Sequence, residues 1–389
     1  MRFGELTRLN RLLLQAIYCG SPRNSHLENN GSHSHRNWGV MAGIRQHILP
    51  RFLLKGFASR VQDKKVFTCV YRKGGPQFET TIENVGLEKY FYGKVGEISA
   101  DEEITQLESG YAKLIEELRS EPDGARVDSK QVSDFVAHLT IRTKQLREFF
   151  RESAEYLIDQ ITPYLSNPSN LKKLLLSKPE LIEQELQKTL KEIPVPQAYK
   201  DFLIELVQLN AQEIVDQHMP DLQSTLQELI AQMKSLLPNG VRDGHIKSLA
   251  KHPAPETRSE GYQSLNWFVR EVAEPLILGD IGCLFEIAGE RRFKPFDDKG
   301  DKIVNVYFPI TSRKLLLGTS HSAAFDVDVS DVNKATSKCS YEYFVCSELS
   351  TANNDLSRSI GDWAGILTKR EMEQLLNEIL ADLDRAPIP

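Results

Sequence analysis

The sequence predicts an α+β protein: a mostly antiparallel sheet packed by helices, with a helical insertion subdomain. Runs rich in β-branched and aromatic residues, separated by Gly, Pro and Asp turns, occur at 66–84 and again at 267–346. Apolar residues at helical spacing dominate 99–161. Residues 167–250 are rich in Leu, Glu, Gln and Lys and are punctuated by prolines, which is typical of several short helices.

The chain has 389 residues, enough for two domains or for one domain with a large insertion. We expect residues 41–166 and 251–389 to form the α+β core and residues 167–250 to form the helical insertion. Residues 1–40 contain five arginines and no lysine within a polar stretch. They are expected to be a disordered leader, or to precede the true translation start at Met41.

Composition places the chain among ordinary globular proteins, with 40% hydrophobic and 26% charged residues. The net charge of −6 does not support a protein that coats nucleic acid, although a local basic groove would not show in that total. No apolar run approaches the roughly 18–20 residues of a membrane-spanning helix, so a soluble, cytoplasmic protein is expected. The five cysteines contain no CxxC pair; Cys339 and Cys346 could meet across a hairpin, but free thiols are expected.

The N-terminal part of the core opens with HILPRFLLKGF, residues 47–57, in which an imidazole, a proline and an arginine precede an apolar strip. VFTCVYR and QFETTIEN follow, separated by KGGP, and this pattern predicts a β-hairpin. A helix is expected from Ser99, with Glu102 completing a capping box. Glu108 falls on the apolar stripe of that helix, so its carboxylate must pair with another group or face a cavity.

A second helix is expected over 128–161, with Arg142 on the flank of its apolar stripe and His138 turned away toward solvent. In the insertion the longest helix is expected at about 197–237, followed by a loop or broken segment at 238–261. Short strands then return from Trp267 onward. Two helices near 352–360 and 369–383 end the chain.

The sequence contains no P-loop, GxGxxG, GxSxG or HExxH motif. The acidic run DVDVSDVN, from Asp326, lacks the glycine and the glutamate of a calcium loop. Three elements remain as candidate sites: the segment with His47, the helix with Glu108, and the turn LGDIG with Asp280. Asp280 could present its carboxylate to a pocket, or it could accept hydrogen bonds within the turn.

HILPRFLLKGF resembles the HYVPRFYLRRF-type opening of the bacterial domain-of-unknown-function 4238 family. The helix ITQLESGYAKLIEEL, the helix with IRT, the LGDIG turn and the segment YFPITSRKLLLG recur in that family's order. The resemblance covers about residues 43–350 without the insertion. Two departures are Ile48 in place of the usual tyrosine and GDIG in place of an SDNP-like turn. The family has no settled activity, so the resemblance implies a site and supplies no reaction.

Two hypotheses follow. In the first, the chain is a hydrolase acting on a phosphodiester or nucleotide, with His47 as general acid or base. Asp280 and Glu108 would orient the histidine or hold a divalent metal, and Arg51 or Arg142 would stabilise developing negative charge. In the second, the protein is a non-catalytic binding or regulatory protein whose helical insertion binds a protein partner. The sequence points to no particular cofactor.

Overall fold

The computed structural model describes residues 45–94, 97–177, 179–191, 193–298 and 300–384. The predictions for residues 1–40 fall outside the described part of the chain. The α+β class is confirmed, since helices and antiparallel sheets are both present. The chain divides into two compact units. We call residues 45–149 with 241–366 the α+β unit, and residues 150–240 with the segment from Leu367 the helical unit.

The strands of the α+β unit form two five-stranded sheets and a two-stranded one, and all pairs are antiparallel. The first sheet has the order β6 (Asn266–Glu271), β11 (Lys314–Thr319), β10 (Lys302–Pro309), β8 (Leu284–Ala288) and β9 (Phe293–Lys294). The second has the order β2 (Arg60–Gln62), β3 (Lys65–Arg72), β12 (Tyr343–Cys346) and β7 (Leu278–Gly279), with β4 (Phe78–Thr81) paired to β3. The two-stranded sheet joins β1 (Arg45–His47) to β5 (Leu87–Lys89).

The hairpin prediction for the first β-rich run is confirmed by the pairing of β3 with β4. The prediction of one sheet is wrong, because β3 pairs with β12 and not with a strand of the β10–β11 hairpin. In that pairing Cys346 lies opposite Cys69. The four described cysteines are free and buried, at positions 69, 283, 339 and 346.

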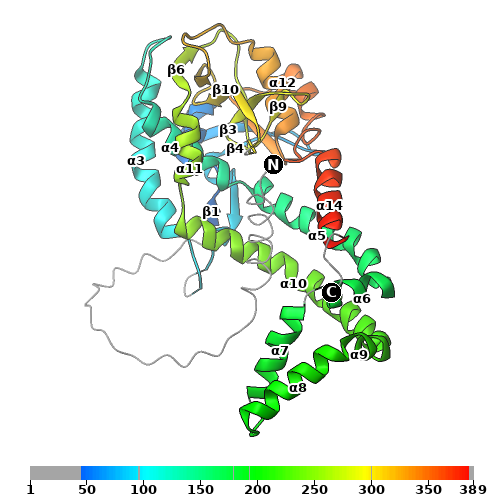
Figure 1. The fold of residues 1–389 in the computed structure, drawn as a ribbon. Coiled ribbons are helices and arrows are strands. Elements are labelled where there is room, and N and C mark those ends of the chain that lie inside the picture. The colour runs from blue at the N-terminus through cyan, green and yellow to red at the C-terminus, as the bar shows by residue number, and fades with distance from the viewer. Residues whose placement is uncertain (1–44, 95–96, 178, 192, 299, 385–389) are drawn as a thin grey trace, which may run out of the picture. The chain divides into compact units, whose positions relative to one another are not determined.

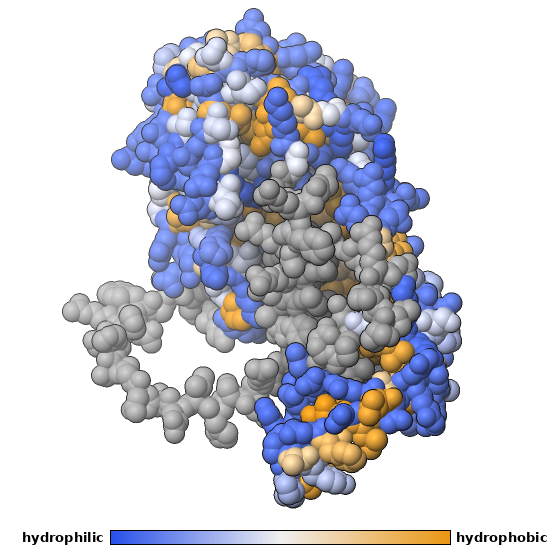
Figure 2. Space-filling view, in the orientation of Figure 1, coloured by the Kyte–Doolittle hydropathy of each residue, from blue (hydrophilic) through white to orange (hydrophobic). Residues whose placement is uncertain are grey.

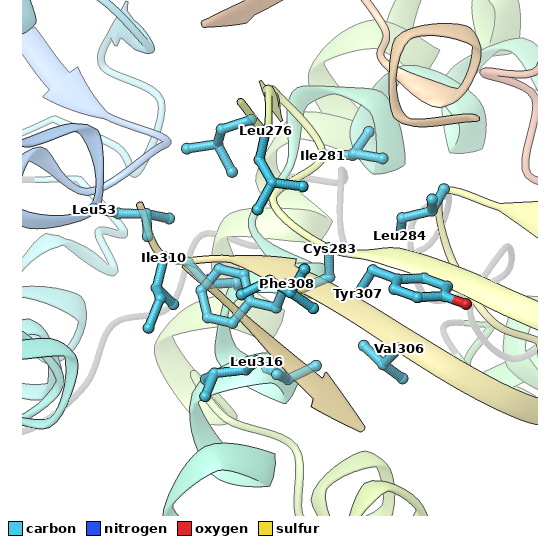
Figure 3. Packing of buried hydrophobic residues seen from close by; sticks show 14 of the residues in the cluster. Leu53, Leu276, Ile281, Cys283, Leu284, Val306, Tyr307, Phe308, Ile310 and Leu316 are labelled. Atoms are coloured by element: carbon cyan, nitrogen blue, oxygen red, sulfur yellow. The ribbon is translucent and has the colours of Figure 1, made fainter. Parts of the chain in front are cut away.

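The core of the α+β unit is built around β10 and β11, as Figure 3 shows. Val306, Phe308 and Leu316 are fully shielded from solvent, and Tyr307 on the opposite face of β10 is 4% exposed. Side chains on both faces of the strand are therefore covered. Full burial of each such residue contributes about 1.5–3 kcal/mol relative to exposure, which makes this sheet the rigid frame of the unit.

Side chains that accept hydrogen bonds from backbone N–H groups mark the starts of helices in the α+β unit. Asp128 caps α4 (Ser129–Ile141) by accepting a hydrogen bond from the Gln131 N–H at 2.9 Å, as the predicted start requires. Ser99 accepts from the Asp101 N–H at 3.3 Å and is not the N-cap of α3 (Asp101–Ser120), so the predicted capping box is wrong.

Two of the longer helices of the α+β unit were not predicted. α12 (Val329–Cys339) begins within the acidic run, where the Asp328 carboxylate accepts from the Asp331 N–H at 3.0 Å. α11 (Glu256–Gln263) packs against α4, as Figure 1 shows. The sequence 238–261, expected to be a loop, is therefore largely helical.

The predicted helix over 128–161 is two helices, α4 and α5 (Lys144–Ser166). Arg142 ends α4, and the Thr143 hydroxyl accepts from the Leu146 N–H at 3.2 Å, which starts the next helix. The apolar periodicity continues across this break, which is why the sequence pattern did not reveal it.

The helical unit consists of short helices from the middle of the chain and one from its end. They are most of α5, α6 (Pro168–Leu176), α7 (Pro179–Lys191), α8 (Gln197–Leu209), α9 (Ala211–Gln217), the first part of α10 (Met219–Lys251), and α14 (Lys369–Asp384). The longest helix in the described part of the chain is α10 and not the predicted 197–237, because α8 ends at Leu209 and α9 at Gln217. α7 packs against α8 (Figure 1), and Figure 2 shows hydrophobic side chains gathered over these helices. No described helix is long and apolar enough to cross a membrane.

The α+β unit also contains four short helical elements among its described residues. They are α2 (Arg51–Leu54), the 3₁₀ helices η1 (Lys55–Phe57) and η2 (Ile82–Asn84), and α13 (Thr351–Ser357). α13 overlaps the predicted helix near 352–360 and ends three residues earlier.

Candidate functional site

A cleft of about 680 Å³ opens in the α+β unit between β1, α2 and α3. Its volume lies in the range of small-molecule sites. Its basic lining residues are Arg45, Arg51 and Lys55, and its acidic ones are Glu83, Asp101 and Glu108. His47 lies among them, so the segment HILPRFLLKGF forms one wall of the cleft.

The segment reaches this position because its apolar side chains anchor it. Pro50, in an extended conformation, precedes α2, and Leu53, Leu54 and Phe57 are fully buried in the core. Arg51 and Lys55 are four residues apart on the opposite side of this turn and remain exposed to the cleft. Burial of the leucines thus orients the two cations.

His47 is half-buried at the end of β1, with its Nδ1 at 3.1 Å from the Val85 carbonyl oxygen. A carbonyl only accepts, so Nδ1 carries the hydrogen and Nε2 keeps its lone pair. Burial, and then the positive charge of Arg51, lowers the pKa of His47 to about 4, although the Val85 carbonyl acts in the opposite direction. The ring is therefore neutral at pH 7 and can accept a proton at Nε2.

Arg142 lies beneath the cleft and is only 1% exposed. Its Nη1 is 2.7 Å from the Glu108 Oε1, and its Nη2 donates to the His47 carbonyl oxygen at 2.7 Å. The Tyr92 hydroxyl donates to the same carbonyl at 3.0 Å. Arg142 is not among the residues that line the cleft. Through these contacts it holds Glu108 and the backbone of His47 in place.

His138 completes this buried network, and the prediction that it faces solvent is wrong. It is 1% exposed, its Nδ1 donates to the Pro253 carbonyl at 2.7 Å, and its Nε2 lies 2.7 Å from Arg142 Nη1. Burial, and then Arg142, lowers its pKa to about 3, so the neutral ring accepts the guanidinium hydrogen. α4 is covered on the side away from its apolar stripe, which the helical pattern alone does not reveal.

Asp280 lies in the turn after β7, outside the cleft lining. Its carboxylate accepts from the backbone N–H groups of Tyr341 at 2.7 Å, Glu342 at 2.6 Å and Tyr343 at 3.2 Å. Burial raises its pKa to about 6, and these three hydrogen bonds only partly oppose the shift. Of the two roles open to Asp280, the structure places it in the turn.

The structure thus brings His47, Glu108 and Arg51 to one cleft, puts Arg142 directly behind it and leaves Asp280 in a separate turn. In the described part of the chain, no group of three or more His, Cys, Asp or Glu side chains is arranged to hold a metal ion. Asp280 therefore does not join His47 and Glu108 in a shared metal site.

Sequence reasoning missed further lining residues, among them Lys55, Asp101 and Thr105. A signal for each was present. Lys55 follows Arg51 by four residues, and Asp101, Thr105 and Glu108 recur at helical spacing on α3. Extending the face around Glu108 along its helix would have found them.

The fold and the cleft define an α+β protein with a polar, concave site near its N-terminal segment. The family described as "Protein of unknown function (DUF4238)" matches residues 45–347, and the chain belongs to this family. Neither a curated protein nor a solved structure matches the chain.

Proposed function

We propose that the protein is a hydrolase that acts on phosphate esters, either a phosphodiester or a nucleotide, in this cleft. The observation that carries the proposal is a neutral imidazole in the same cleft as three cations, Arg45, Arg51 and Lys55. The side chains of Arg51 and Lys55 line the cleft and are exposed. Their charges are therefore available to a phosphate oxygen.

His47 serves as the general base in this proposal. A water molecule donates one proton to Nε2 while its oxygen forms a bond to phosphorus. The ester P–O bond breaks, its electron pair leaves with the alcohol oxygen, and the imidazolium returns the proton to that oxygen. The hydrogen bond from Nδ1 to Val85 orients the ring throughout. Arg51 and Lys55 stabilise the negative charge on the phosphoryl oxygens.

A pKa of about 4 is low for a base that works near pH 7. Part of the shift comes from the positive charges of Arg51, Arg142 and Arg45. An anionic ligand bound to the exposed cations offsets that positive potential and raises the pKa of His47 in the complex. Substrate binding thus strengthens the base that acts on it.

The test uses the purified full chain with bis-(p-nitrophenyl) phosphate, p-nitrophenyl phosphate and AMP. His47→Asn keeps a donor for Val85 and removes Nε2, so we expect kcat to fall about 10²–10⁴-fold with the fold intact. His321→Asn is the matched control, because His321 is exposed and outside the cleft lining. Absence of wild-type hydrolysis of all three compounds, or a full rate in His47→Asn, would overturn the proposal.

A non-catalytic binding protein is the second candidate function. Four exposed apolar side chains of α8 recur at helical spacing: Tyr199, Phe202, Leu206 and Leu209. An amphipathic helix of a protein partner is the ligand that such a stripe fits. Under this alternative, Phe202→Ser with Leu206→Ser produces the cellular phenotype of a gene deletion, whereas His47→Asn behaves as wild type. Under the hydrolase proposal, His47→Asn produces the phenotype of a gene deletion and the double serine variant of α8 behaves as wild type.

A further inference from the structure

The lining of the cleft is divided between two kinds of side chain. Arg45 on β1, Arg51 on α2 and Lys55 on η1 supply cations from one wall. The other wall is a single face of α3, where Asp101 and Glu108 carry carboxylates and Thr105, between them, carries a hydroxyl. Ile104, on the same face, is 2% exposed and anchors the helix. The two walls therefore suit different parts of one ligand.

The α3 wall cannot receive a phosphate, because its two carboxylates repel an anion. Carboxylate oxygens accept hydrogen bonds, so the ligand group at this wall must donate them. Glu108 is prepared for that role, since Arg142 binds its Oε1 at 2.7 Å and fixes its orientation while 27% of its side chain remains exposed. A hydroxyl or an amino group of the ligand fits here.

The charge balance distinguishes these two donors. The cleft is lined by three cations and by three carboxylates, of which Asp101 and Glu108 lie on α3 and Glu83 lies on η2, and the buried Arg142 adds one more positive charge behind Glu108. Arg142 already pairs with the Glu108 carboxylate at 2.7 Å, so an ammonium at this wall would gain little attraction and would lie close to another cation. A neutral donor is favoured, so the donating group is a hydroxyl.

We infer that the ligand of the cleft is a phosphorylated sugar, as in a nucleotide. Its phosphate binds Arg45, Arg51 and Lys55, and its sugar hydroxyls donate to Asp101 and Glu108 on α3. This inference rests on the proposed function only in taking the cleft as the ligand site. A site of about 680 Å³ accommodates a ligand of this size.

Calorimetric titration of the full chain tests the inference with AMP, 2′,3′-dideoxy-AMP, inorganic phosphate and phosphoethanolamine. We expect AMP to bind at least about 10-fold more tightly than its dideoxy analogue, because hydrogen bonds to ionised acceptors are lost in the analogue. Asp101→Asn with Thr105→Val should reduce this difference without weakening the binding of inorganic phosphate. Glu103→Gln, on the exposed side of the same helix, is the matched control and should retain wild-type affinities.

Equal binding of AMP and its dideoxy analogue, tighter binding of phosphoethanolamine, or loss of phosphate binding in the α3 double variant would each overturn the inference. The same experiments distinguish failure of this inference from failure of the proposed hydrolase function. If AMP binds through its hydroxyls and is not hydrolysed, the hydrolase proposal fails and the inference stands. If p-nitrophenyl phosphate is hydrolysed with dependence on His47 while AMP shows no hydroxyl dependence, the inference alone fails.

Discussion

Arg142 connects the two segments that form the walls of the cleft. One guanidinium binds the Glu108 carboxylate and the His47 carbonyl oxygen, and it also contacts His138 Nε2. A buried cation is tolerated only when it is paired and hydrogen-bonded. Because the guanidinium is planar and has five N–H donors, arginine can serve several acceptors at once, whereas the ammonium of lysine is a compact point charge.

This geometry predicts that Arg142→Lys destabilises the α+β unit by about 2–4 kcal/mol, since part of a buried network loses its donor. The measurement is urea unfolding followed by the fluorescence of the buried Trp267. Arg358→Lys is the control, because Arg358 pairs with Asp355 at the surface and should change stability by less than about 0.5 kcal/mol. Equal unfolding midpoints for Arg142→Lys and the control would contradict the assignment.

Gly56 is a second residue with a definite structural requirement. A Cβ at this position would lie 2.2 Å from the Ile310 carbonyl oxygen and 2.7 Å from Arg119 Nη2. We expect Gly56→Ala to cost more than about 2 kcal/mol, because backbone and a partly buried guanidinium must move. Gly110→Ala on α3 has open space around it and should stabilise by about 0.5–1 kcal/mol. Thermal unfolding of both variants checks the opposite signs.

At the scale of elements, the break between α4 and α5 decides where Arg142 points. Arg142 occupies the C-cap of α4, and Thr143 caps the start of α5. A continuous helix over 128–161 would place Arg142 on the flank of a regular stripe. The interruption instead lets its guanidinium reach β1 and α3.

Thr143→Ala removes the side-chain acceptor for the Leu146 N–H and should destabilise the unit by about 1 kcal/mol. Thr143→Ser keeps the oxygen and should retain most of the stability. Comparing their urea midpoints separates the stability contributed by the capping hydroxyl from that contributed by the methyl group. A loss in Thr143→Ser as large as in Thr143→Ala would show that packing, and not capping, is responsible.

At the scale of the whole molecule, the α+β unit contains three histidines that are neutral when folded. Burial is the main cause that lowers the pKa of His47 to about 4 and those of His138 and His245 to about 3. The pKa of an unfolded histidine is about 6.5, so below that pH the unfolded chain binds more protons. Asp280 acts oppositely, because its folded pKa of about 6 exceeds the unfolded value.

We therefore expect the melting temperature to fall between pH 7 and pH 5, since three histidines outweigh one carboxyl group. His245→Gln can still donate to the Ile141 carbonyl and should show a shallower pH dependence, even if its melting temperature is lower. His321→Asn, an exposed control, should retain the wild-type slope. Thermal melts at pH 5, 6 and 7 provide the measurement, and identical slopes in all three proteins would contradict this account.

Much of the α+β architecture was predictable from local sequence. The β3–β4 hairpin, the start of α4 at Asp128 and the strands after Trp267 follow from alternation, caps and turn residues, which act over a few neighbouring positions. The same holds for part of the cleft. His47, Arg51 and Glu108 were predicted because each is a polar side chain next to an apolar pattern, and all three line the cleft.

Other features depend on partners far away in the chain. β12 joins β3 to β7, which separates the strands into two sheets. The cover over His138 comes from the segment around Pro253, and the backbone of residues 341–343 holds the Asp280 carboxylate. By itself the sequence determined the α+β class and the segment that forms the site, because backbone propensity and hydrophobic period are local. Only the tertiary structure decided which polar groups meet, because that choice depends on long-range packing.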